Sequence, residues 1–118
     1  MKLREIQKII NAEVLTGEKH LDNEIETAFA CDLMSDALTF KEDKTLLLTG
    51  LVNPHTIRTA EMMDIGAIVF VRGKKPDEAT IKLAEEVDIV IMTTPNILFT
   101  CSGILFANGI KGAELSCR

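Results

Sequence analysis

The chain has 118 residues, of which 47% are hydrophobic and 26% charged, and its formal net charge is −5. This length suits one domain with a single core, and no apolar run approaches the roughly 20 residues that span a bilayer. An acidic chain without tyrosine or tryptophan lacks the basic faces and stacking platforms that nucleic acids require. We therefore expect one domain over residues 1–118, ordered to about residue 110, that binds neither nucleic acid nor membrane.

The cysteines and the N-terminus indicate a cytoplasmic protein. Cys31, Cys101 and Cys117 are widely spaced and form neither a metal-ligand pair nor a disulfide framework. Two dispersed histidines complete no ligand set with them, so we expect no metal and no cofactor. The N-terminal residues carry charges and lack the apolar core of a secretory signal.

The N-terminal part predicts a helix followed by extended segments. Leu3, Ile6 and Ile10 recur at helical spacing, which predicts a helix over residues 2–12. Further along we expect, in chain order, an extended piece, a turn, a strand and a short helix over residues 13–15, 16–18, 25–32 and 33–40. The strand ends at a carboxylate, Asp32.

The remainder repeats a strand–loop–helix unit three times. Continuous apolar strands are expected over residues 45–48, 67–71 and 89–92, and each is followed by a polar loop and a proline. Proline is favoured at the first helical position, so Pro54, Pro76 and Pro95 are expected to open helices. Such strands are usually buried on both faces, and right-handed crossovers make them parallel. The sequence therefore predicts an α/β domain with a mostly parallel sheet flanked by helices.

Several residues should define the ends and the interior of these units. Asn53 and Thr94 are expected to cap helices, and Gly66 and Gly109 to end them in a left-handed conformation. Cys101 lies on an apolar helical stripe and is expected to be a buried structural thiol. The core is expected to contain Leu46, Leu48, Ile68, Phe70, Ile89 and Ile91. Residues 111–118 are expected to form a loose tail.

No catalytic machinery is evident. The nearest approach to a phosphate-binding P-loop is Gly73-Lys74-Lys75, which lacks the first glycine and the hydroxyl. No glycine fingerprint for a dinucleotide follows any strand. We therefore expect no catalytic residues and no enzymatic activity.

Ligands of open parallel sheets lie outside the carboxyl ends of the strands. The loops at those ends supply glycines that allow close approach, helix starts that favour anions, and an arginine that grips phosphate or carboxylate. The candidate ligand-binding residues are Thr49, Gly50, Asn53, Arg72, Gly73, Thr93 and Thr94. The alternative is that the glycines only make turns, Asn53 and Thr94 only cap helices, and Arg72 only pairs with a surface acid.

Two stretches of the sequence resemble a known family. The first, Val14-Leu15-Thr16-Gly17-Glu18 with Leu21-Asp22 and Ile25, is similar to the opening of the N-terminal domain of HPr kinase/phosphorylase. The second runs from residue 45 through the strand at 68–71 to Thr93-Thr94, and resembles the DRTGG domain. The five-residue motif itself is absent: Arg72-Gly73 stands where the family commonly has threonine-glycine or glycine-glycine, and Asn53-Pro54 replaces an acidic helix start.

The resemblance implies a fold like the N-terminal domains of HPr kinase and Mur ligases. DRTGG domains occur alone, between regulatory CBS domains, and ahead of phosphotransacetylase domains, which implies sensing or assembly. The kinase activity of HPr kinase belongs to its other, P-loop domain. We expect a non-catalytic regulatory module that binds a small phosphate- or carboxylate-bearing ligand or a partner protein, and that forms a homodimer. The alternatives are a structural dimerisation subunit without a ligand, or an enzyme whose site the sequence does not reveal.

Overall fold

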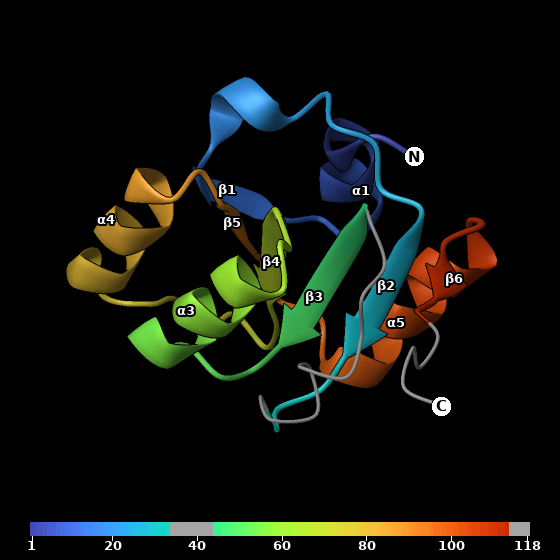
Figure 1. Ribbon diagram of the computed structural model, residues 1–118. Coiled ribbons are helices and arrows are strands. Elements are labelled where there is room, and N and C mark those ends of the chain that lie inside the picture. Colours follow the sequence, from blue (N-terminus) through green and yellow to red (C-terminus); the bar gives the residue numbers. More distant parts are fainter. Residues whose placement is uncertain (34–43, 114–118) are drawn as a thin grey trace, which may run out of the picture.

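The computed structural model of the protein describes residues 1–33 and 44–113. Helices cover both faces of a sheet with strand order β1-β5-β4-β3-β2-β6 (Figure 1). The strands of the described residues are β1 (Glu13–Thr16), β2 (Thr27–Ala30), β3 (Thr45–Thr49), β4 (Ala67–Phe70), β5 (Val90–Thr93) and β6 (Lys111–Gly112). Their helices are α1 (Leu3–Ile9), the 3₁₀ turn η1 (Glu18–His20), α3 (Pro54–Met62), α4 (Glu78–Glu86) and α5 (Leu98–Ala107).

The sheet is mostly parallel, as the sequence predicts. The β6–β2, β2–β3, β3–β4 and β4–β5 pairs are parallel, and only β1 runs antiparallel to its neighbour β5. Lys111–Gly112 add the edge strand β6, so the prediction of a loose tail from residue 111 is wrong at its start. These residues pair because the chain after α5 returns alongside β2. Residues 114–118 lie outside the described residues.

The core lies in two layers, one on each face of the sheet. On one face, α1 and α5 pack with Leu46, Leu48 and Val69. On the other, α3 and α4 pack with Leu47, Ile68 and Phe70. Alternate residues of each strand face opposite layers, so these strands need apolar side chains throughout. All six predicted core residues are buried, and so is Cys101, whose pKa is raised by burial to about 11.

The helix starts are only partly as predicted. Asn53 caps α3 by accepting a hydrogen bond from the Thr56 N–H at 3.1 Å, and Pro54 is the first helical residue. Pro76 and Pro95 precede their helices instead of opening them, since α4 has Asp77 and α5 has Ile97 at the N-cap position. Thr94 is therefore not a cap, and its hydroxyl serves another contact.

The ends of several elements also differ from the predictions. Gly66 is not a left-handed helix end, because Asp64 takes that conformation with φ 59°, whereas Gly109 does so as predicted with φ 102°. The first helix ends at Ile9 and the chain turns at Asn11, with φ 53°. The strand expected over 25–32 is confined to Thr27–Ala30. Of the helix expected over 33–40, residues 34–40 lie outside the described residues.

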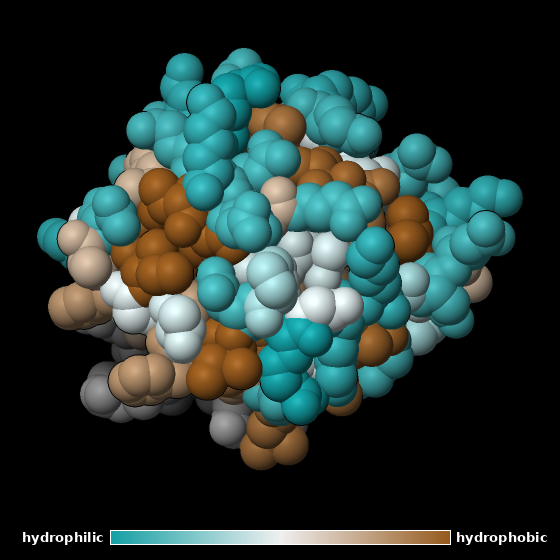
Figure 2. All heavy atoms as spheres, turned by 180° about the vertical axis from the view of Figure 1, so that it is seen from behind, coloured by the Kyte–Doolittle hydropathy of each residue, from teal (hydrophilic) through white to brown (hydrophobic). Residues whose placement is uncertain are grey.

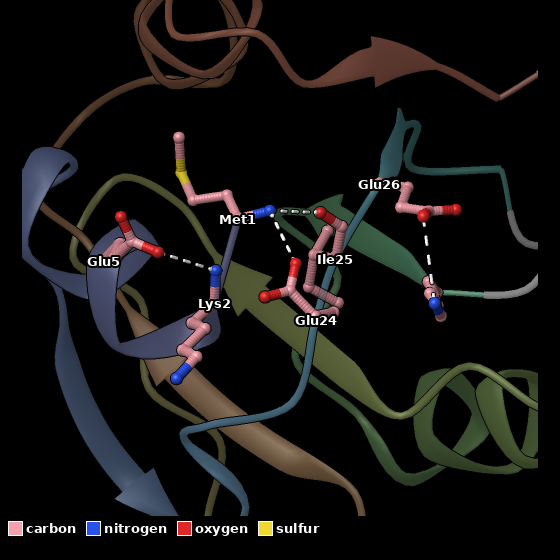
Figure 3. A network of polar contacts seen from close by, with 7 residues as sticks. Met1, Lys2, Glu5, Glu24, Ile25 and Glu26 are labelled. Atoms are coloured by element: carbon pink, nitrogen blue, oxygen red, sulfur yellow. Dashed lines mark hydrogen bonds and ion pairs between the residues drawn. The ribbon is translucent and has the colours of Figure 1, made fainter.

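Polar contacts join the start of the chain to the segment before β2. The Met1 ammonium group donates to Glu24 Oε2 and to the Ile25 carbonyl, each at 3.0 Å (Figure 3). The Lys2 N–H donates to Glu5 Oε1 at 3.1 Å, within the first turn of α1. These contacts fix the start of α1 beside the sheet, where Leu3 and Ile6 are buried.

Gly17 marks a close approach between the β1–η1 turn and β5. Its φ is +93°, and a Cβ atom there would lie 2.8 Å from Val90 Cγ2 and 2.9 Å from Val90 Cα. We predict that Gly17→Ala lowers the free energy of unfolding by about 2 kcal/mol or more, through left-handed strain and overpacking together. Denaturant titration measures this loss. Gly109→Ala is the control, since its φ is also positive but nothing lies within 4 Å. An equal loss in both variants would show that contact with Val90 is unimportant.

Candidate functional site

The candidate site lies where four parallel strands end. Asp32 follows β2, Thr49 ends β3 and is followed by Gly50, Arg72 to Lys74 follow β4, and Thr93 ends β5. The strands are adjacent and parallel, so their carboxyl ends meet at one edge of the sheet.

The Asp32 carboxylate joins the ends of β2 and β3. Its Oδ1 accepts the Gly50 N–H at 2.8 Å and the Thr49 hydroxyl at 3.0 Å. The Thr49 hydroxyl oxygen in turn accepts the Leu51 N–H at 3.1 Å. A carboxylate of the chain itself thus occupies the donors that the sequence suggested for an external anion.

The electrostatics of this contact favour the ionised carboxylate. The Gly50 N–H is the main reason that the pKa of Asp32 lies below the ordinary value of an aspartate. Partial burial opposes this lowering, while the Thr49 hydroxyl and the charges of Lys74 and Arg72 add to it.

Two cationic side chains converge on the same turn. Lys74 Nζ donates to the Gly50 carbonyl at 3.1 Å. A Cβ atom on Gly50 would lie 3.8 Å from Arg72 Nη2 and 3.6 Å from Asp32 Oδ1, so all three side chains meet around this glycine. Arg72 is exposed and Lys74 half-buried. The turn thus presents two positive charges beside one carboxylate.

The Arg72-Gly73 turn has a left-handed backbone that is fixed by hydrogen bonds to the segment at the end of β5. Both residues have positive φ, 61° and 68°. Their N–H groups donate to the Asn96 and Thr94 carbonyls, each at 2.8 Å. These amides are engaged within the protein, so the Arg72 guanidinium remains as the main donor that this turn offers outward.

The other predicted site residues have internal partners. Thr93 and Thr94 are buried; Thr93 donates its hydroxyl to the Lys74 carbonyl at 2.7 Å, and Thr94 donates to the Ile10 carbonyl at 2.6 Å. The Asn53 side chain caps α3. The structure therefore brings Thr49, Gly50 and Arg72 together, and gives the remaining polar side chains structural contacts as well.

Two residues of this cluster were not among the predicted site residues. Asp32 had a signal, because it follows a strand that was expected to end at the same edge. Lys74 had none beyond its place after Arg72-Gly73, since a sequence does not show that its ammonium group turns back to Gly50. Among the described residues, no group of three metal-ligating side chains is present, and no helix is long and apolar enough to cross a membrane.

The lowered pKa of Asp32 gives a test by pH. Its stabilising effect is present above the ordinary aspartate pKa, about 3.9, and is lost as the pH falls through the lower folded-state pKa. We predict that Asp32→Asn is less stable than wild type by about 1 kcal/mol at neutral pH, allowing for the exposure of the group. This difference should shrink below about pH 4. Denaturant titrations from neutral to acidic pH measure it.

Salt provides the control for that prediction. The leading cause of the lowered pKa is a hydrogen bond, so added salt should leave most of the difference in place. A difference abolished by salt, or one independent of pH, would contradict the role assigned to the Gly50 N–H.

Comparisons with known proteins identify the family. The family model described as the DRTGG domain matches residues 5–106. A solved structure with the same fold contains the CBS and DRTGG domains of the regulatory region of Clostridium perfringens pyrophosphatase, complexed with the activator diadenosine tetraphosphate. The TM-score is 0.74 at 18% identity, over 88% of this chain and 45% of that chain, so this protein spans under half of the neighbour. No curated protein matches at a significant level. The match over most of its length shows that the chain belongs to the DRTGG domain family.

Proposed function

We propose that this domain is a non-catalytic regulatory module that binds a small anionic ligand at the carboxyl edge of its sheet. The observation that carries the proposal is the convergence of the Arg72 guanidinium and the Lys74 ammonium group beside Gly50. Lys74 joins the candidate contacts predicted from the sequence, which are Thr49, Gly50, Asn53, Arg72, Gly73, Thr93 and Thr94. Of those seven residues, Arg72 and Gly73 are exposed. A regulatory role accords with membership in a family found in the regulatory region of a pyrophosphatase.

The ligand class follows from the donors. A guanidinium and an ammonium group side by side suit a phosphate or carboxylate, while the Asp32 carboxylate beside them suits hydroxyl groups. A phosphorylated, hydroxyl-bearing small molecule satisfies both. Diadenosine tetraphosphate is one such molecule. It is present in the structure of the Clostridium perfringens pyrophosphatase regulatory region, and is therefore a suitable first probe.

We infer in addition that the domain acts in the cytoplasm as a homodimer. Cys101 is a buried thiol without a disulfide, which suits a reducing compartment. Homodimerisation is supported by Phe99 and Phe106, large apolar side chains that stay exposed in the isolated chain. The absence of nucleic-acid and membrane partners, and the likeness to the N-terminal domain of HPr kinase, stay predictions from the sequence.

Thermal unfolding with candidate anions tests the binding site. A ligand that binds the folded state raises the Tm by mass action. We expect inorganic phosphate, nucleotides, acyl phosphates and diadenosine tetraphosphate to include at least one that does so. For that anion, Arg72→Gln should weaken binding about tenfold or more, since a hydrogen bond to a charged group is lost.

Arg58→Gln is the matched control for charge. Arg58 is exposed on α3 and pairs with Glu61 at 3.3 Å, so this variant changes the net charge equally but away from the sheet edge. Equal weakening in both variants would indicate a general charge effect, and no Tm shift with any anion would contradict the proposed site.

A further inference from the structure

The outer face of α5 carries an apolar stripe. Phe99 and Phe106 are 85% and 74% exposed, and they lie two helical turns apart on one side of the helix with Gly103 between them. Helix α5 lies on the right in Figure 1 and therefore on the left in the view from behind, where hydrophobic side chains gather (Figure 2). An aromatic pair this exposed is unusual for a helix whose other face already packs on the sheet through Cys101 and Leu105.

Gly103 at the centre of this stripe has no packing role among the residues that the structure describes. A glycine inside a helix costs about 1 kcal/mol relative to alanine. Among the described residues, a Cβ atom on Gly103 would meet nothing within 4 Å, so their packing does not require a glycine here. The open space beside Gly103 would let a second helix approach α5 closely.

A hollow lies beside the C-terminal end of the same stripe. It measures about 130 Å³ and is lined mainly by apolar groups from α5, β2 and the chain after α5, among them Ala28, Ala30, Leu105, Phe106 and Ile110. An apolar cavity of about 150 Å³ is known to take up benzene, so a phenylalanine ring is of the right size for this hollow.

Charge further limits what can cover this face. No residue from Ile89 to Ile110 carries a formal charge, although the chain as a whole has a net charge of −5. A charged partner would find no complementary group on α5. A second copy of this chain therefore meets no like-charge repulsion from α5.

We propose that two copies of this chain associate through α5, packed antiparallel about a two-fold axis near Gly103. In that arrangement Phe99 lies opposite the partner subunit's Phe106 and beside the hollow that this residue lines. The axis repeats the contact, so each copy supplies one projecting ring and one hollow, as an isologous interface requires. Gly103 lets the two helices approach closely where they cross. This assigns a specific face to the homodimer inferred above, and its test does not require anion binding at the sheet edge.

Sedimentation velocity of the full chain across the micromolar range tests the interface. We expect wild type to be a dimer, and Phe99→Glu and Gly103→Leu to raise the dimer dissociation constant about tenfold or more, as loss of central interface contacts does. Met62→Glu is the matched control, because Met62 is also a highly exposed apolar residue, 72% exposed, and lies on α3. It should leave association unchanged. Circular dichroism checks that every variant is folded.

Mild oxidation of Gly103→Cys provides a second measurement. Residues beside a two-fold axis lie close enough for a disulfide between copies, so this variant should cross-link readily and Met62→Cys should not. A wild-type monomer at all concentrations, or a dimer that persists in Phe99→Glu, would overturn the proposal. Dimerisation lost only in Met62→Glu would place the interface on the other face. A monomer that still binds an anion through Arg72 would refute this interface and the homodimer, and would leave the proposed anion-binding function standing.

Discussion

Burial of β3, β4 and β5 on both faces is the constraint on which the rest of the structure depends. Every residue of these three strands is buried. A sheet of this kind is stable only if helices cover both sides, and α1 with α5 and α3 with α4 provide those two layers. Polar side chains are therefore confined to the edges of the sheet, where the loops and the helix ends meet. The location of any polar site follows from this arrangement.

The same constraint explains why so few polar groups at the carboxyl edge are available to a ligand. Loops that connect buried strands must satisfy their backbone groups locally, because burial without a partner is costly. Here the Asp32 carboxylate, the Thr93 and Thr94 hydroxyls and two backbone carbonyls fill this role. The long side chains of Arg72 and Lys74 reach beyond this layer. In the proposed site, anion binding consequently depends on these two cations more than on the helix starts that the sequence suggested.

Properties set by local sequence were predictable, and those set by tertiary contacts were not. The apolar strands, their parallel order and the Asn53 cap follow from periodicity and short-range chemistry, and all are confirmed. Thr94 has the same cap-like sequence context as Asn53, yet its hydroxyl donates to the carbonyl of Ile10, the residue that follows α1 and is distant in sequence. Gly66 has a sequence context that suits a left-handed helix end, but α3 ends at Met62 and Asp64 adopts the left-handed conformation instead. The Lys74 contact likewise depends on where the β3 turn lies in space.

The two proposed surfaces share one connecting loop. Asn96 lies between them: its carbonyl accepts the Arg72 N–H at 2.8 Å, and its side chain donates to the Ile10 carbonyl at 3.1 Å. Helix α5 begins directly beyond this loop, at Leu98. If an anion shifts the Arg72 turn, the contact with Asn96 would carry that shift to the segment that precedes α5. Thermodynamic linkage then fixes the relation between the two events: whatever factor the anion changes in dimer affinity, dimerisation changes in anion affinity. Such reciprocity would let a small domain without catalytic groups report the concentration of a ligand through its state of association.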